Sequence, residues 1–407
     1  MVGKKDAKAW LSGSIIGVVL WVCLFNLPQA RSASVPGVTD DTILIGVPAP
    51  LSGPAALFAK QAADFPEAVY LEWGKNIHGR NIKLIKADDG CDPVKAVAAV
   101  KKLIYVDKVF LLHGPACTSA ILASKPIIAQ EGIPAVTTGG PADAIVNPLV
   151  KGLFNPGFSS SGTARSMVDF AMSKPGVKRV GIVHHTTEWA MSYYNPLIAY
   201  LKEKYDITPV ADVVTEMGVA DVTPQVLKLK AANPDVILAP IYISETTAFL
   251  RDANKLGLDV PIIGATATST TDQYESLKSL VPVKKFFTPF WCKYALDHPK
   301  VKVYEDVFKK YHPEKKFDAQ TLCAFNAPVL VIDALKRCGR DLTQQKFIDV
   351  LETSYQNWEP DNYIGAGPLS FSKTDHQGMK KMVMSTVGTG KFEIVATYGE
   401  YEGLMKK

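Results

Sequence analysis

The sequence predicts an α/β protein with two doubly wound parallel-sheet lobes. Short runs rich in β-branched residues alternate with amphipathic helical stretches, which is the pattern of βαβ units. The alternation occurs as two successive series that repeat in kind without obvious sequence identity. Without its N-terminal leader the chain has roughly 370 residues, more than a single hydrophobic core usually supports, so we expect two domains.

The first series predicts strands at 43–48, 82–87, 109–112 and 134–138, because these short apolar runs end at turn residues. Helices are expected between them at 55–73, 92–106 and 118–130. The second series predicts strands at 180–184, 208–214, 236–240 and 262–265, with helices at 193–205, 223–232 and 245–256.

The C-terminal part breaks this alternation. We predict a strand at 286–291, helices at 304–311 and 319–337, and a hairpin of 382–387 with 392–398. A chain that finishes its second lobe and then supplies further helices is expected to return to the first. We therefore assign residues 42–155 and 289–378 to lobe 1, and residues 156–288 and 379–403 to lobe 2, with crossing strands as the hinge.

The N-terminus has the pattern of a cleaved signal peptide over residues 1–34. Three lysines precede the apolar segment 10–27, and small residues that suit cleavage follow, with Ser32 and Ser34 fitting best. A retained membrane anchor is the alternative, although the apolar run is near the minimum length for spanning. Bulky residues before Cys23 argue against lipidation. We expect an exported protein.

Export permits disulfides, and five cysteines remain after the leader, at 91, 117, 292, 323 and 338. The odd number leaves at least one thiol free or paired between chains. Cys323 and Cys338 lie in one predicted helix, about 22 Å apart by helical rise, and cannot bond each other. Cys292 could reach either of them, and the spacing does not choose.

Composition and motifs disfavour nucleic-acid binding and catalysis. The net charge of +5 includes +3 from the leader, which leaves +2, and no basic run carries interleaved aromatic residues. Consecutive His184 and His185 at a strand end should point to opposite faces, so a shared metal site with Glu188 is disfavoured. No P-loop, dinucleotide fingerprint or nucleophile elbow occurs. We predict no enzymatic activity, no metal and no cofactor; an exported hydrolase or lyase that uses His184 or His185 is the alternative.

A candidate ligand-binding turn follows the predicted strand 109–112. Thr118 and Ser119 begin the next helix, where ligands bind in α/β folds because free backbone N–H groups point beyond the strand ends. A Thr-Ser pair at a helix start can also serve only as a helix cap. Cys91 follows the neighbouring strand, so Cys91 and Cys117 are expected at the same end of one sheet.

Taken together, the segments resemble the periplasmic solute-binding proteins of the branched-chain amino acid (Leu/Ile/Val-binding) type, which serve ABC transporters. The resemblance spans residues 43–398, and its motifs are IGVPAPLSGPA (45–55), IHGR (77–80), DDGCDP (88–93), GIP (132–134), RVGIVH (179–184) and LRDANKLG (250–257). It implies type I lobes joined by three crossovers, which close around a small ligand. It also implies a periplasmic monomer that delivers this ligand to a membrane permease.

The resemblance also implies site residues. Thr118 and Ser119 fall where relatives hold the ligand carboxylate, and Cys91 and Cys117 fall where many relatives have a disulfide. The remaining positions are the close-approach glycines Gly139 and Gly140, the second-lobe aromatics Trp189 and Tyr242, and Phe58 of the first lobe. Each aromatic residue could instead belong to the core.

Two positions depart from the amino-acid-binding pattern. Thr266 stands where relatives that bind amino acids carry a carboxylate for the ligand ammonium group, and Pro141 replaces a hydroxyl-bearing residue. A neutral hydroxyl cannot balance a desolvated cation. An aromatic or other organic acid is therefore a candidate ligand beside an amino acid, unless another acid such as Glu188 restores the ammonium site. A sensory ligand-binding module without a transporter is a further alternative.

Overall fold

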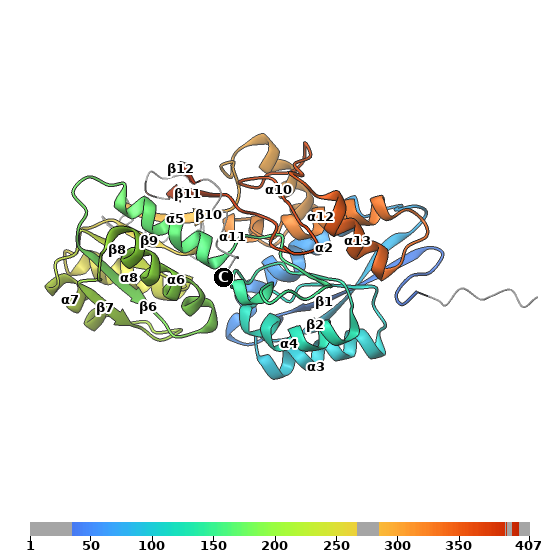
Figure 1. Ribbon diagram of the computed structural model, residues 1–407, viewed down its shortest axis with the longest axis horizontal. Helices are drawn as coiled ribbons and strands as arrows, with labels where there is room; N and C mark the ends of the chain where they lie inside the picture. Colours follow the sequence, from blue (N-terminus) through green and yellow to red (C-terminus); the bar gives the residue numbers. More distant parts are fainter. Residues whose placement is uncertain (1–34, 267–284, 387, 389–392, 399–407) are drawn as a thin grey trace, which may run out of the picture. The chain divides into compact units, whose positions relative to one another are not determined.

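The computed structural model describes residues 35–266, 285–386, 388 and 393–398 (Figure 1). The predicted signal peptide, residues 1–34, lies outside the described residues and stays a prediction. Among the helices that are described, none has both the length and the apolar character needed to cross a membrane.

The first sheet contains five parallel strands in the order β2-β1-β3-β4-β5. Its strands are β1 (Thr42–Ala49), β2 (Asn81–Asp88), β3 (Leu111–His113), β4 (Ala135–Val136) and β5 (Leu153–Phe154). Most of β1 is buried, as expected for a central parallel strand with helices on both faces. In Figure 1, α3 (Pro93–Lys101) and α4 (Thr118–Glu131) lie together on one side of β1 and β2, and α2 (Phe65–Trp73) lies on the other.

The second sheet contains seven strands in the order β12-β11-β10-β9-β8-β6-β7. Five run parallel: β6 (Val180–His184), β7 (Ala211–Val214), β8 (Val236–Ala239), β9 (Ile262–Gly264) and β10 (Phe286–Phe290). β11 (Met382–Thr386) and β12 (Glu393–Tyr398) add the antiparallel hairpin that the sequence predicts. The helices of this series are α5 (Ser160–Met172), α6 (Glu188–Tyr205), α7 (Thr223–Ala231) and α8 (Ile243–Lys255), with α5 packed on α6 and α7 on α8.

After β10 the chain returns to the first series. It forms α10 (Pro299–Tyr311), α11 (Ala319–Leu322), α12 (Asn326–Cys338) and α13 (Gln344–Ser354), and both α10 and α12 pack against α2. It then enters the second sheet again at β11. The α/β class with two parallel-sheet lobes is thus confirmed, whereas the exact lobe boundaries stay a prediction.

Several elements differ from the sequence prediction. The helix expected at 55–73 is divided into the 3₁₀ helix η1 (Pro54–Phe58), the π-helix η2 (Lys60–Asp64) and α2. The helix expected at 319–337 is also divided, into α11 and α12, so the premise that Cys323 and Cys338 share one continuous helix was wrong, although the two thiols are unbonded as predicted. Both cysteines and Cys292 are buried free thiols.

Four of the described elements were missed altogether: β5, α5, α13 and the 3₁₀ helix η4 (Asp143–Ile145). The first turn of α5 is rich in serine, and no helix was predicted there. The structure shows that Ser159 caps this helix, because its side chain accepts a hydrogen bond from Gly162 N at 3.0 Å. Capping also explains why α6 begins at Glu188 rather than at 193: the Thr187 hydroxyl accepts from Ala190 N at 3.3 Å.

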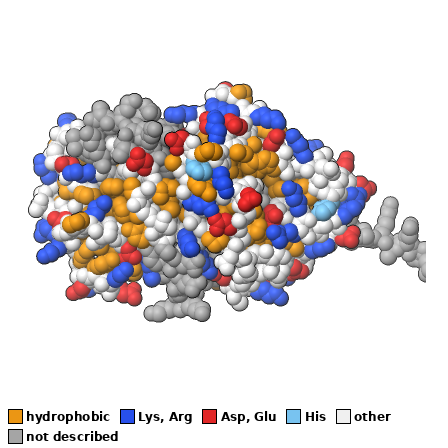
Figure 2. Space-filling model, turned by 90° about the horizontal axis from the view of Figure 1, so that it is seen from above, with side chains coloured by type: hydrophobic (Ala, Val, Ile, Leu, Met, Phe, Trp, Pro, Cys, Tyr) orange, Lys and Arg blue, Asp and Glu red, His pale blue; other side chains and the backbone are white. Residues whose placement is uncertain are grey.

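The charged surface is mixed on the face seen in Figure 2. Lysine and arginine side chains lie among aspartate and glutamate side chains there, with hydrophobic side chains between them. Such interspersed charges give this face no extended field of one sign, so it offers no electrostatic feature that favours a polyanionic partner.

Candidate functional site

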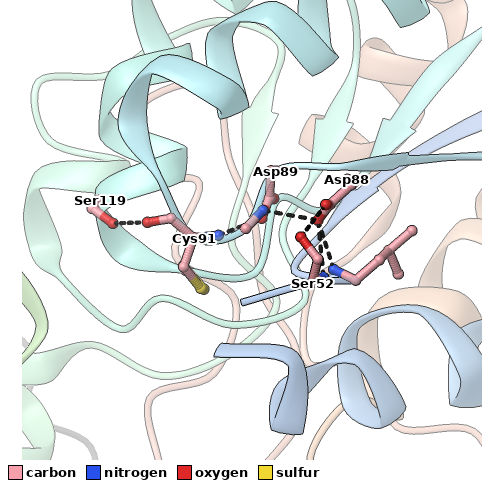
Figure 3. The surroundings of a disulfide bond; sticks show 8 residues. Ser52, Asp88, Asp89, Cys91 and Ser119 are labelled. Atoms are coloured by element: carbon pink, nitrogen blue, oxygen red, sulfur yellow. Dashed lines mark hydrogen bonds between the residues drawn. A yellow bond between two sulfur atoms is a disulfide. The ribbon is translucent and has the colours of Figure 1, made fainter. Parts of the chain in front are cut away.

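The predicted disulfide between Cys91 and Cys117 is confirmed, with the two Cα atoms 5.5 Å apart. It joins the turn after β2 to the residue that precedes α4. The turn is further held by the Asp88 carboxylate, which accepts from Leu51 N at 2.9 Å and from Gly90 N at 3.1 Å (Figure 3). Two loops and the start of α4 are therefore tied together at the carboxyl end of the first sheet.

Asp89 lies beneath this turn. Its side chain is fully buried, and Oδ1 accepts from Cys91 N at 2.9 Å, while Oδ2 has no hydrogen-bond partner. Burial raises the pKa of Asp89 to about 6, and the neighbouring Asp88 carboxylate adds to the shift. Asp88, in contrast, is exposed at the strand end.

The two hydroxyls at the start of α4 have different environments. Ser119 Oγ donates to the Cys91 carbonyl oxygen at 3.1 Å, so it stabilises the turn that Figure 3 shows. Thr118 is 4% exposed, and its Oγ1 has no hydrogen-bond partner. A buried hydroxyl without a partner is costly, which makes Thr118 the stronger candidate for contact with a ligand.

Gly139 and Gly140 follow β4 and approach other parts of the first lobe closely. A Cβ on Gly139 would lie 2.8 Å from the Ala116 carbonyl oxygen, and a Cβ on Gly140 would collide with Ile121 and lie 2.9 Å from Ile145 Cδ1. Gly140 also has a φ of +71°, which favours glycine. Packing within the lobe therefore requires both glycines, independently of any ligand.

His113, at the end of β3, is part of a buried hydrogen-bonded row that sequence reasoning missed. Its Nδ1 lies 2.8 Å from the Tyr70 hydroxyl, and its Nε2 lies 2.9 Å from Thr138 Oγ1. Burial lowers the pKa of His113 to about 3, so the imidazole is neutral at physiological pH. The row connects α2 to the residue just before Gly139.

The predicted aromatic residues lie close together. Trp189 stacks on Tyr242 with ring centroids 4.5 Å apart, and the Phe58 ring lies 6.0 Å from Tyr242. His185, which was not predicted as a ligand residue, lies 4.6 Å from Tyr242, measured between ring centroids. The structure thus brings together aromatic side chains from the ends of β6 and β8 and from η1 of the first series.

Thr266 follows β9 and is 3% exposed, with its Oγ1 2.8 Å from the Tyr193 hydroxyl. This pairing leaves Thr266 engaged with a neutral partner. Glu188 is exposed, although it begins the same helix as the buried Trp189. Glu245 in the first turn of α8, which the sequence interpretation did not single out, is a buried acid whose charge acts on His185.

The two consecutive histidines have separate partners, as the alternation of a strand predicts. His184 Nε2 lies 3.3 Å from Asp212 Oδ1, and its ring stacks on Tyr194. His185 Nδ1 lies 2.8 Å from the Thr187 hydroxyl, while its Nε2 has no partner. Burial lowers the pKa of His185 to about 4, although the charge of Glu245 opposes this shift.

One group of potential metal ligands occurs in the described part of the chain. Oxygen and nitrogen atoms of Asp64, Glu67 and His312 lie within 4.8 Å of one another. However, Lys315 Nζ lies 2.6 Å from Asp64, and Lys86 Nζ lies 2.7 Å from Glu67. The carboxylates are already paired with ammonium groups that would repel a cation, so this cluster is interpreted as an ion-pair network.

Comparisons with known proteins agree with this architecture. An "Amino acid binding protein" of Pseudomonas aeruginosa is 26% identical over 220 residues, which are 53% of this chain and 58% of that protein. The chain thus spans less than two thirds of this curated relative.

Two solved structures share the fold at low identity. The solute-binding protein of an R. palustris ABC transporter in complex with 4-hydroxybenzoate has a TM-score of 0.76 and 19% identity, and the match covers 90% of this chain and 100% of that one. The branched-chain amino acid transporter substrate-binding protein LivJ from Streptococcus pneumoniae, in complex with isoleucine, has a TM-score of 0.74 and 21% identity, with 88% and 100% covered. The family model described as "Periplasmic binding protein" matches residues 42–391. The chain therefore belongs to the periplasmic binding protein family.

Proposed function

We propose that this protein is an extracytoplasmic solute-binding receptor of an ABC uptake transporter, without enzymatic activity of its own. It captures a small carboxylate-bearing ligand between the first lobe, residues 42–155 and 289–378, and the second lobe, residues 156–288 and 379–403. In this proposal the receptor is an exported periplasmic monomer, and its partner is a permease in the inner membrane.

The observation that carries the proposal is the buried, unpartnered hydroxyl of Thr118 at the start of α4. A carboxylate oxygen would accept from this hydroxyl and from free backbone N–H groups of the first helical turn, so that the ligand's negative charge lies at the positive end of the helix. Ser119 and the Cys91–Cys117 disulfide would keep this turn in place. Gly139 and Gly140 would bring the neighbouring loop close to it.

The aromatic cluster would bind the body of the ligand. Trp189, Tyr242 and Phe58 present flat apolar faces, which suit a ring or a branched aliphatic chain. Thr266 offers no charge for an ammonium group and is already paired with Tyr193. We therefore favour an aromatic or other small organic acid over an amino acid. This choice is compatible with the fold relatives, one of which was solved with 4-hydroxybenzoate and another with isoleucine.

Thermal-shift screening of the purified mature protein tests the proposal. Benzoate, hydroxybenzoates and short aliphatic acids are compared with isoleucine, leucine and phenylalanine at equal concentrations. Organic acids are expected to raise the Tm by mass action, and a ligand at 100 times its Kd adds about 2.7 kcal/mol. If only compounds with a free α-ammonium group raise the Tm, the interpretation that the site lacks a charge for an ammonium group at Thr266 is wrong. Turnover of a bound acid that depends on His184 or His185 would instead support an exported hydrolase or lyase.

A further inference from the structure

A second group of unsatisfied polar atoms lies directly after β6 and β7 and in the first turn of α8, next to the aromatic cluster. It consists of His185 Nε2, Thr215 Oγ1 and Glu245 Oε2, none of which has a hydrogen-bond partner. Their residues are 1%, 2% and 0% exposed, respectively, so solvent does not reach these atoms freely. Because buried polar atoms in native proteins are nearly always paired, three such atoms in one region are candidates for contact with a polar group.

Strand register places two of these residues side by side. His184 pairs with Val214 in the parallel ladder of β6 and β7, so His185 and Thr215 are the next pair along the same edge. Thr215 N also donates to the His184 carbonyl oxygen at 2.8 Å, which continues the ladder by one bond. Residues at paired positions project to the same face of a parallel sheet.

Glu245 reaches the same region from α8. Its Oε1 accepts from Gly218 N, three residues after Thr215, and its charge acts on His185. Tyr242, immediately before α8, has its ring 4.6 Å from the His185 imidazole. The three atoms therefore lie beside the aromatic residues to which the ligand body is assigned.

The hydrogen bonds around His185 accommodate the tautomer that carries its proton on Nε2. The Thr187 oxygen accepts from Ala190 N, and in one tautomer of His185 its hydrogen is donated to Nδ1, 2.8 Å away. A neutral imidazole that accepts at Nδ1 carries its proton on Nε2. In this tautomer His185 Nε2 is a donor without an acceptor, while Glu245 Oε2 is an acceptor without a donor.

We propose that His185, Thr215 and Glu245 form a subsite that recognises a hydroxyl group of the ligand. A hydroxyl accepts from His185 Nε2–H through its oxygen and donates its hydrogen to Glu245 Oε2, while Thr215 can take either role. In this tautomer an ammonium group has no lone pair for His185 Nε2–H, and a carboxylate would be repelled by Glu245. This inference rests on the proposed function and narrows it to ring-hydroxylated aromatic acids, with the carboxylate at Thr118 and the hydroxyl at this subsite.

Isothermal titration of the mature protein with four acids tests the subsite: benzoate, 3-hydroxybenzoate, 4-hydroxybenzoate and 4-methoxybenzoate. At least one hydroxybenzoate is expected to bind at least about tenfold more tightly than benzoate, because a site with buried polar groups discriminates strongly against a ligand that leaves them unpaired. The methoxy compound can accept but cannot donate to Glu245, so it should bind no better than benzoate.

Three variants assign this preference to the subsite. Glu245→Gln keeps the Oε1 acceptor for Gly218, Thr215→Val keeps the side-chain shape, and His185→Gln removes the imidazole donor. Each is expected to reduce the hydroxybenzoate-to-benzoate preference at least threefold while changing benzoate affinity less than threefold. Thr223→Val, on the nearby helix α7, serves as a control that should leave the preference unchanged.

The outcomes separate the two proposals. If benzoate and both hydroxybenzoates bind equally well, the subsite is overturned and the groups hold only buried water, while the proposed function stands. Survival of the full preference in all three variants also overturns the subsite. If no acid binds, the proposed function fails together with it. Loss of the preference in Thr215→Val alone, with correct folding confirmed by circular dichroism, already supports the subsite if the other two variants fail to fold.

Discussion

Nε2 of His113 lies 2.9 Å from the hydroxyl of Thr138, which links the end of β3 to the loop that carries Gly139. Tyr70 completes the row on the other side of the imidazole, 2.8 Å from Nδ1. The phenol has an acceptor if it donates to Nδ1, and Nε2–H then donates to Thr138. This arrangement leaves the Thr138 hydrogen free for a further acceptor, so the row orients a loop that belongs to the proposed site.

The His113 row predicts a loss of stability in acid. The folded-state pKa of His113 is lowered to about 3 from an ordinary value of 6.5, so below pH 6.5 the unfolded chain takes up a proton that the folded chain does not. Stability attributable to His113 is therefore present above pH 6.5 and decreases as pH falls toward 3. At pH 5 the loss is about 2 kcal/mol relative to pH 8.

Urea unfolding at pH 8 and pH 5 measures this effect. The His113→Gln variant should be less stable than the wild type at pH 8, and its stability should decrease less on acidification, by about 2 kcal/mol. His185 and His376, whose pKa values burial also lowers, are present in both proteins, so their contributions cancel in the comparison. An identical pH dependence in the two proteins would show that His113 does not titrate as described.

Asp89 predicts a pH effect of the opposite sign. Its folded-state pKa is raised to about 6 from 3.8, so ionisation opposes folding, and the associated stability is lost as pH rises through this range. Asp89→Asn keeps the acceptor for Cys91 N but carries no charge. We expect this variant to be about 1–3 kcal/mol more stable than the wild type at pH 7.5, and to gain nothing at pH 3.5. Equal gains at both pH values, measured by urea unfolding, would contradict a charge effect.

The disulfide predicts sensitivity to reduction. Cys91 and Cys117 are 26 residues apart, and closing a loop of this size stabilises a protein by about 3 kcal/mol in the chain-entropy model. The double variant Cys91→Ala, Cys117→Ala should unfold at lower denaturant concentration, and dithiothreitol should lower the wild-type midpoint toward that of the variant. The double variant also controls for other effects of dithiothreitol on the midpoint, because it has no disulfide to reduce. Its remaining cysteines, Cys292, Cys323 and Cys338, are free thiols. A wild-type midpoint that is unchanged by reduction would contradict this role.

Substitution of Gly140 by alanine should show a packing effect that can be separated from the strain of a positive φ. A Cβ at Gly140 meets Ile121 and Ile145, whereas a Cβ at Gly132, with a comparable φ of +62°, meets nothing within 4 Å. Gly132→Ala should therefore cost only the strain of a positive φ, on the order of 1 kcal/mol. Gly140→Ala should cost about 1–3 kcal/mol more because of overpacking. Equal losses in chemical denaturation would mean that Ile121 moves aside without cost.

Much of the fold could be predicted because its strands are unbroken apolar runs. Val180–His184 was predicted with its observed bounds, since buried parallel strands are recognisable from composition alone. The break between α11 and α12 was not predictable in this way, because apolar residues continue through it and three-dimensional packing decides where the helix ends. The whole of α5 was missed, because its first turn consists of small polar residues that show no apolar periodicity.

In the candidate site, too, some residues could be predicted from the sequence and others could not. Thr118 could be proposed because it follows a strand end, where ligands bind in α/β proteins, whereas Trp189 and Tyr242 were proposed from the family resemblance alone. His185 and Glu245 could not be linked from the sequence, since they lie 60 residues apart and only the folded chain shows that each retains an unpartnered atom. Ser119 illustrates the converse, because only the structure shows that its hydroxyl is bonded to the Cys91 carbonyl.

The most direct test of the central claim is the affinity of an organic acid for the Thr118→Val variant, measured by isothermal titration. Valine keeps the shape of threonine and removes only the unpartnered hydroxyl. The account predicts that benzoate or a hydroxybenzoate binds at least about tenfold more weakly to this variant than to the wild type, because the carboxylate loses a charge-assisted hydrogen bond. The exposed substitution Thr353→Val should leave the affinity unchanged. An acid that binds the wild type and Thr118→Val equally well would contradict the assignment of the carboxylate to the start of α4.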